Sequence, residues 1–130
     1  MTRATHRTYM INAQYKGDKP SGWDGQNWNH HIITVKNLKT GKRTSFDFWA
    51  SIARPHLSTK DDILGAFRCF LDDCVCGLES FEDFCADLGY DTDSRRAEAT
   101  WKACRRSAEK FKRISTDDIY DLINSLDDYA

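Results

Sequence analysis

The chain has 130 residues, of which 40% are hydrophobic and 30% are charged, and its formal net charge is −1. This length can bury one hydrophobic core without disulfides or metal but is short for two, so we expect one domain over residues 1–130. No apolar run approaches the ~18 residues of a membrane helix, and no basic-then-apolar leader opens the chain. We therefore expect a soluble protein that stays where it is made.

The charges are segregated along the chain. Residues 1–57 carry nine basic and three acidic side chains, and residues 95–113 carry eight and two. In contrast, residues 58–94 carry ten acidic and two basic side chains, and residues 114–130 carry five acidic side chains and no basic one. Such blocks favour pairing between basic and acidic elements, and they leave faces of one sign that can steer an oppositely charged partner.

The five cysteines lie in helical patterns among apolar residues rather than in a loop framework. Their number is odd, which is typical of reduced thiols in a cytosol and not of a disulfide scaffold. We expect a cytoplasmic protein. The cysteines are Cys69, Cys74, Cys76, Cys85 and Cys104.

The first third of the chain predicts strands. Residues 1–8 lack apolar periodicity and are expected to form a loose arm, whereas Tyr9 to Tyr15 alternates as a half-buried strand does. Residues 16–26 are rich in Gly, Pro, Asp and Ser, which predicts a loop that carries Trp23.

A hairpin follows this loop. Residues 27–35 and 43–49 alternate between apolar and polar side chains, and they flank a Gly-containing connection over 36–42. This pattern is typical of two antiparallel strands joined by a turn. With the strand at Tyr9, the sheet part of the domain, residues 8–50, is predicted to hold three antiparallel strands.

Residues 58–128 predict about four helices. Ser58 and Thr59 with Asp61 and Asp62 form a capping signal at the start of one helix, and Ser80 with Asp83 forms another. Ser115 with Asp118 gives a further cap. The predicted helices cover residues 59–76, 81–88, 94–113 and 116–127.

The helix over 94–113 has one narrow apolar stripe and a basic remainder. We expect Trp101 and Phe111 to be buried against the other helices. The stripe consists of Ala97, Trp101, Cys104, Ala108 and Phe111. The fold class is therefore α+β, with a three-stranded antiparallel sheet and about four helices packed on one face of it.

Residue patterns that suggest catalysis or metal binding fail on inspection. Asp91 and Asp93 could hold a hard cation, but Arg96 stands where a calcium loop needs Gly. We interpret these carboxylates as helix caps in a local Asp–Arg network. His30 and His31 are adjacent in a strand and point to opposite faces, so they cannot ligate one zinc ion together.

Cys74-x-Cys76 has the wrong spacing for a zinc knuckle or a redox pair. No cysteine has an evident His partner in the sequence, which leaves no support for nucleophilic catalysis. We therefore expect no enzymatic activity, no metal and no cofactor.

The motif F-x-x-F-C-x-x-L-G-Y-D-x-D-S-R over residues 81–95, followed by W-K-A-C over 101–104, resembles a widespread group of small bacteriophage accessory proteins. Upstream elements of the same pattern include Asp18 to Pro20, Thr40 to Lys42 and Phe46 to Trp49, so the resemblance covers about residues 9–113. It implies a viral protein made in the cytosol of a bacterial host. Such proteins often inhibit host defence, including CRISPR complexes.

The functional expectation is a non-enzymatic, anti-CRISPR-like protein that binds and blocks a host defence complex, such as a CRISPR effector or nuclease. The alternative is a nucleic-acid-binding accessory protein that uses the basic helix 95–113 and the hairpin lysines Lys36, Lys39 and Lys42. Aromatic residues and arginines dominate most protein interfaces, and acidic clusters can imitate phosphates. The candidate partner-binding residues are Trp23, Trp28, Arg95, Arg105, Arg106, Asp121, Asp127 and Asp128.

Overall fold

The structure, a computed structural model, describes residues 2–20, 27–51, 57–76, 80–88, 91–93 and 95–129. An antiparallel sheet forms the N-terminal part, with its strands in the order β1-β2-β3-β4. The strands are β1 (Thr2–His6), β2 (Tyr9–Pro20), β3 (Asn27–Asn37) and β4 (Arg43–Ser51). The α+β class predicted from the sequence is confirmed, and the sheet has four strands where three were predicted.

The additional strand is β1, which lies where a loose arm was predicted. A two-residue turn at Arg7 and Thr8 folds it back on β2, and Arg7 adopts a φ of 53° there. Only Ala4 of this strand is a buried apolar residue. Because an edge strand can be held by backbone hydrogen bonds alone, its sequence shows no apolar alternation that would have revealed it.

Strand β2 also runs further than predicted. Its pairing with β3 shifts register between Tyr15 and Gly17 and then continues to Pro20 opposite Asn27. Gly17 has a φ of 103°, a backbone conformation that residues with a Cβ atom rarely adopt. The glycine therefore forms a β-bulge inside a strand where its composition suggested a loop.

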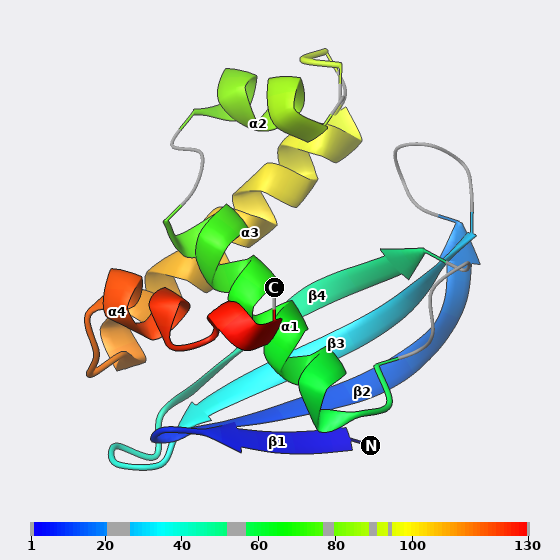
Figure 1. The fold of residues 1–130 in the computed structure, drawn as a ribbon. Helices are drawn as coiled ribbons and strands as arrows, with labels where there is room; N and C mark the ends of the chain where they lie inside the picture. The colour runs from blue at the N-terminus through cyan, green and yellow to red at the C-terminus, as the bar shows by residue number, and fades with distance from the viewer. Residues whose placement is uncertain are drawn as a thin grey trace.

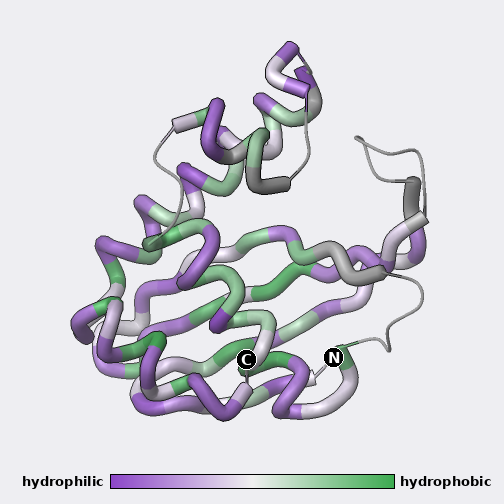
Figure 2. Tube along the Cα trace, turned by 45° about the horizontal axis from the view of Figure 1, so that its top comes forward, coloured by the Kyte–Doolittle hydropathy of each residue, from purple (hydrophilic) through white to green (hydrophobic). Residues whose placement is uncertain are grey.

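The hairpin of β3 and β4 is confirmed, in a register that places Lys36 opposite Arg43. The inner face of the sheet alternates along each strand and is buried, whereas Ile32 and Thr34 lie on the outer face. Figure 2 shows the hydrophobic positions interrupted by hydrophilic ones along the strands. The buried inner positions of these two strands include Ile33, Val35, Thr44 and Phe46.

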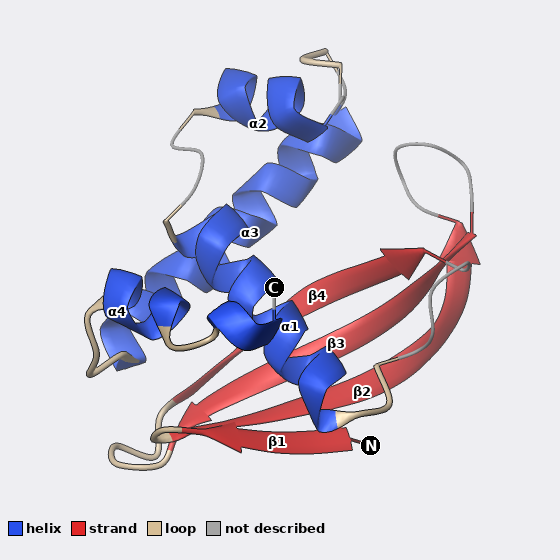
Figure 3. Ribbon diagram, viewed as in Figure 1, coloured by secondary structure: helices blue, strands red, loops and turns tan. Residues whose placement is uncertain are grey.

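The helices follow the sheet and cover one of its faces. They are α1 (Lys60–Phe70), continued by the π-helical turn η1 (Leu71–Val75), α2 (Phe81–Leu88), α3 (Arg95–Ile114), α4 (Ile119–Asn124) and the 3-10 turn η2 (Asp127–Tyr129). Helix α1 packs on β1 and β2, α3 packs on β4, and α2 lies on α3 away from the sheet (Figures 1 and 3). Among the described residues, no helix combines the length and apolar character needed to span a membrane.

Three of the four predicted helix starts agree with the structure to within one residue. Thr59 accepts a hydrogen bond from the Asp62 amide at 3.1 Å, and Asp62 accepts one from the Thr59 amide. Ser80 likewise accepts from the Asp83 amide. The last helix begins at Ile119 and not near residue 116, because the cap is Asp118, which accepts from the amide of Asp121.

An aromatic cluster joins the sheet, α1 and α3 in one core. Tyr9 of β2 contacts Phe67 and Phe111 with ring centroids 5.9 and 5.8 Å apart. Phe46 of β4 stacks on Phe70 of α1 at 4.0 Å. Phe111 is fully buried, as predicted, whereas Trp101 is only partly buried in a second, smaller cluster between α2 and α3.

Candidate binding surface

Helix α3 carries a continuous basic surface on its solvent side. Its opposite face is buried, with Ala97 in the small cluster and Ala108 and Phe111 in the main core. At 100° per residue, five of the eight basic side chains of α3 fall within an arc of about 80° and along roughly 27 Å of helix. All are exposed. We call this set the α3 basic face: Arg95, Lys102, Arg106, Lys110 and Arg113.

Within the described residues, ion pairs compensate little of the α3 basic face. Lys102 pairs with Glu98 at 3.0 Å. Within the described part of the chain, no ion pair to the other four members is observed. An exposed lysine–glutamate pair one turn apart adds little stability, and it leaves the other four members uncompensated. The face is therefore positive.

Arg105 is separated from the other two predicted arginines. It lies about 100° around the helix from Arg106, on the side that meets η1. Its guanidinium is 3.7 Å from Glu109, and 31% of its side chain is exposed. Arg95 and Arg106 thus share one outward face, and Arg105 does not belong to it.

The acidic candidates are largely compensated by arginines of the same chain. Asp121 pairs with Arg7 at 3.1 Å, and Asp127 pairs with Arg68 at 3.1 Å. Asp128 is exposed. Two of the three carboxylates predicted to imitate phosphates therefore already face a cation, and they stabilise the docking of the C-terminal segment.

Of the two aromatic candidates, the described residues include Trp28 alone. Trp28 is half-buried in β3, in register with Lys19 of β2 and Ser51 of β4. Trp23 lies outside the described residues, so its prediction stays untested.

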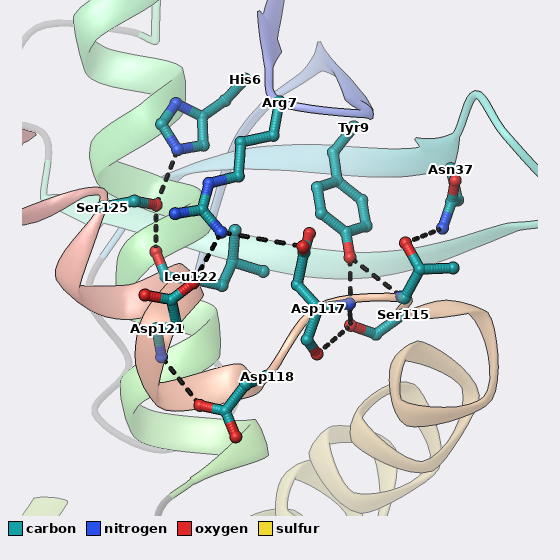
Figure 4. A network of polar contacts seen from close by, with 11 residues as sticks. His6, Arg7, Tyr9, Asn37, Ser115, Asp117, Asp118, Asp121, Leu122 and Ser125 are labelled. Atoms are coloured by element: carbon teal, nitrogen blue, oxygen red, sulfur yellow. Dashed lines mark hydrogen bonds and ion pairs between the residues drawn. The ribbon is translucent and has the colours of Figure 1, made fainter.

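Sequence reasoning missed a network of polar contacts that joins the β1–β2 turn to the last fifteen residues (Figure 4). The His6 Nε2 atom is 2.8 Å from the Ser125 Oγ atom. Arg7 lies 3.1 Å from Asp121 and 3.7 Å from Asp117. These partners are more than a hundred positions apart, and no local pattern links them.

The network continues along the edge of the helical layer. The Tyr9 hydroxyl lies 3.0 Å from the Ser115 hydroxyl and accepts from the Thr116 amide at 3.2 Å. The buried Asn37 side chain donates to the carbonyl of Ile114 at 2.7 Å. In this way the strands satisfy the backbone groups where α3 ends.

The His6 and Ser125 side chains are as close as a catalytic base and a serine nucleophile. However, the hydrogen bond between them has the opposite direction from the one that activates a serine. Ser125 donates to the Leu122 carbonyl at 2.6 Å, so the His6 ring donates to the hydroxyl oxygen. An activated serine must instead give its proton to the imidazole. Burial, aided by Arg7, lowers the pKa of His6. This arrangement fixes α4 in place.

The histidines of β3 occupy opposite faces, as the strand pattern predicted. His30 Nε2 lies 2.7 Å from Asp47, and the His31 ring contacts Tyr15 at 5.2 Å. In the part of the chain that the structure describes, no group of three or more His, Cys, Asp or Glu side chains is arranged to hold a metal ion.

Comparisons with known proteins place the chain in no established group: no family model, no curated protein and no solved structure matches it.

Proposed function

We propose that this protein is a non-enzymatic, phage-encoded binding protein that attaches to a host defence complex through the α3 basic face and blocks it. The observation that carries the proposal is the contrast between the two charged surfaces. Arg95, Arg106 and Arg113 stand exposed in one row, whereas Asp121 and Asp127 are paired within the chain. Uncompensated charge on a rigid helix is available to a partner of opposite sign.

A protein partner suits the surroundings of this face better than a nucleic acid does. Glu98 and Glu109 of α3 are exposed, about 60° and 40° around the helix from Arg95. A phosphate backbone is uniformly negative, so these carboxylates repel it. A protein surface can offer acidic residues to Arg95 and Arg106 and basic residues to the two glutamates, which is the pattern that gives specific pairing.

Arginines on such a face act as anchors. A guanidinium can form two parallel hydrogen bonds with one carboxylate, and arginine is enriched among the residues that dominate interface energy. The α3 basic face holds three of them on a helix whose opposite side is packed against the sheet and α1. We infer that the contact involves acidic residues of a CRISPR effector, a nuclease or a comparable assembly.

Charge reversal tests the proposal. The triple variant Arg95→Glu, Arg106→Glu and Arg113→Glu should abolish rescue of a defence-sensitive phage in a plating assay, because each substitution replaces attraction by repulsion. The matched control reverses Lys39, Lys42 and Arg43, which are exposed in the β3–β4 hairpin and change the net charge equally. The control should plate like the wild type.

Circular dichroism and thermal unfolding establish that both triple variants are folded. If the α3 variant is folded and still rescues the phage, the proposed contact is wrong. If both triple variants lose activity, total charge rather than the α3 basic face governs binding.

A salt series distinguishes the proposed function from the alternative, which is nucleic-acid binding through α3 and the hairpin lysines. We expect no gel shift with DNA or RNA at physiological salt. A binder of the phosphate backbone would show tight binding at low salt that falls steeply as salt rises, with a log–log slope of about −0.9 for each contacted phosphate of duplex DNA. Such a slope for the wild type, with a smaller slope for both triple variants, would contradict the proposed function and support the alternative.

A further inference from the structure

Strand β4 lies at one edge of the sheet, so half of its backbone groups face away from the other strands. At the start of its pairing with β3, the Asn37 amide donates to the carbonyl of Lys42 at 2.9 Å. Hydrogen-bonded and non-bonded residue pairs alternate along an antiparallel ladder, so the even-numbered residues of β4 bond to β3 and the odd-numbered residues do not. The residues whose N–H and C=O groups point outward are therefore Arg43, Ser45, Asp47, Trp49 and Ser51.

Helix α3 covers the first part of this edge. The Ser107 hydroxyl of α3 donates to the outward carbonyl of Ser45 at 3.1 Å. Covering an edge with a helix is one of the ways in which proteins prevent unwanted strand pairing. In the described part of the chain, no hydrogen bond to the outward backbone groups of β4 is observed beyond Ser45. We call the stretch from Asp47 to Ser51 the β4 edge, and among the described residues it keeps backbone groups that another strand can pair with.

The opposite edge of the sheet, strand β1, holds only five residues. The Leu38 amide donates to the carbonyl of Thr8 at 2.7 Å, so the next residue of β2 directs its backbone groups to β1. By alternation from that residue pair, Arg3 and Thr5 are the residues of β1 whose groups point outward. Both edges thus present an outward N–H at an exposed residue, Thr5 in β1 and Asp47 in β4. Helix α1 packs on β1, whereas α3 packs on β4.

The α3 basic face lies next to the β4 edge. At 100° per residue, Lys110 is about 60° around α3 from Ser107, and Arg106 is about 100° from it. Between Ser107 and Lys110 the helix carries Ala103, whose small side chain leaves room for a main chain beside it. Figure 1 shows α3 crossing β4 and continuing away from the sheet towards α2. A strand added to the β4 edge therefore runs alongside cationic side chains.

We propose that the β4 edge binds an extended segment of the protein that the α3 basic face contacts, as a fifth strand of the sheet. Backbone hydrogen bonds supply the affinity of such strand addition, and alternate side chains supply its specificity. The side chains of the segment on the helical side meet α3 and are acidic, whereas the side chain opposite the exposed Asp47 on the outer side is basic. The inference rests on the proposed function, since it specifies which element of the partner is bound.

A second copy of this chain suits the β4 edge less well. Two-fold pairing of two β4 edges would place two α3 helices on the same side of one continuous sheet, each next to the junction. The two α3 basic faces would then repel each other. Sedimentation velocity of the pure protein tests this point, and we expect a monomer. A dimer that dissociates in the Asp47→Pro variant would assign the edge to a second copy and overturn the proposal.

Proline at position 47 tests the fifth strand. Proline lacks the N–H group, and because the Asp47 N–H points away from β3, the substitution leaves the β3–β4 ladder intact. In the phage-plating assay, Asp47→Pro should lose rescue. Asp47→Ala should keep rescue, because alanine removes the carboxylate and its contact with His30 but keeps the N–H, and an exposed ion pair adds little. The matched control is Thr5→Pro, which removes an outward N–H from the opposite edge and should plate like the wild type.

Circular dichroism establishes that the proline variants are folded. If Asp47→Pro does not fold, Ala103→Glu replaces it, because a long carboxylate at this helix position obstructs the segment and repels its acidic side chains. The proposal is overturned if a folded Asp47→Pro variant, or Ala103→Glu in its place, still rescues the phage. It is also overturned if Asp47→Ala or Thr5→Pro loses rescue to the same extent as Asp47→Pro.

Comparison with the triple α3 variant distinguishes this inference from the proposed function. If the triple variant loses rescue and Asp47→Pro keeps it, the proposed function stands and the fifth strand is wrong. If Asp47→Pro loses rescue and the triple variant keeps it, the α3 contact is wrong and the partner binds through the β4 edge. A wild type that gives no rescue contradicts both.

Discussion

Tyr9 joins the hydrophobic core to the polar network at the C-terminal side of the molecule. Its ring is fully buried between Phe67 and Phe111. Its hydroxyl meets Ser115 and accepts from the Thr116 amide where α3 ends. The ring could be predicted from strand alternation, but the hydroxyl's partners could not, because they are more than a hundred residues away.

Replacing Tyr9 by Phe keeps the ring and removes this anchor. We expect the free energy of unfolding to fall by about 1–3 kcal/mol, because the Thr116 amide and the Ser115 hydroxyl lose a partner in a part-buried site. Urea unfolding measures the change. The matched control is Tyr120→Phe, whose side chain is 69% exposed and should unfold like the wild type. Equal stabilities for the two variants would contradict the network.

His6 gives the same network a pH dependence. Burial and the charge of Arg7 lower its pKa from the usual 6.5. Between 6.5 and the lower folded value, the unfolded chain binds more protons than the folded one, so the free energy of unfolding decreases as the pH falls through this window. His6→Gln has no proton to gain. We expect the wild type to lose more stability than His6→Gln between about pH 7 and pH 5.

Urea titrations at both pH values measure this difference, and the remaining ionisable groups serve as an internal control because both proteins share them. Parallel pH profiles would show that His6 does not titrate differently in the folded and unfolded states.

At the level of elements, α2 and the first half of α3 form a unit that is distinct from the main core. Phe81 contacts Trp101 at 5.7 Å, and Cys85 and Ala97 complete this small cluster. The second half of α3 belongs to the main core through Ala108 and Phe111. One helix therefore connects a large cluster with a small one, and their stabilities should differ.

Two alanine substitutions test whether the two clusters contribute differently to stability. Phe111→Ala should cost about 3–5 kcal/mol and weaken the whole molecule, because it opens a cavity among Tyr9, Phe67 and Phe70. Trp101→Ala should cost less, because Trp101 is only partly buried.

Hydrogen exchange distinguishes the two effects. The Trp101 variant should lose protection in α2 and the start of α3 only, whereas the Phe111 variant should lose it across the sheet. Loss of sheet protection in the Trp101 variant would show that the clusters unfold together.

Helices were easier to predict than strands in this chain for a physical reason. The capping residues Thr59 and Ser80 and the stripe ending in Phe111 are local signals, so the predicted bounds agree within a few residues. The strand at Ala4 and the bulge at Gly17 depend on pairing with a distant partner. Their own residues are polar or typical of turns, and they gave no such signal.

The candidate surface was predictable only in part. The exposure of Arg95 and Arg106 followed from helical periodicity, because their angular positions lie opposite the buried stripe. The pairing of Asp121 with Arg7 required the tertiary fold, since the acidic helix and the β1–β2 turn are remote in sequence. Charge pattern alone could not decide which of the two surfaces remains uncompensated.

For the molecule as a whole, the C-terminal segment returns to the start of the chain and to α1. Helix α4 follows the polar network, and η2 lies against α1 (Figure 1). Gly65 of α1 lies close to this segment: a Cβ built on it would be 2.9 Å from the carbonyl oxygen of Tyr129. Arg68, one turn further along α1, pairs with Asp127 of the same segment.

This close approach reverses the change in the free energy of unfolding that is normally expected for a Gly→Ala substitution in a helix. Alanine inside a helix is normally more favourable than glycine by about 1 kcal/mol. Here the added methyl group meets a backbone oxygen, so η2 must shift, and we expect the free energy of unfolding to fall by roughly 1–2 kcal/mol. The control is a chain ending at Leu126, in which no η2 remains.

In that shortened chain the same substitution should stabilise the fold, because only the helix propensity of alanine is left. The comparison is a cycle of four proteins, in which the substitution and the truncation are coupled only if Gly65 and η2 touch. Urea unfolding of all four gives the coupling free energy. A substitution that stabilises both the full and the shortened chain would mean that the C-terminal segment does not rest on α1, and the Arg68–Asp127 pair would then lose its supporting contact as well.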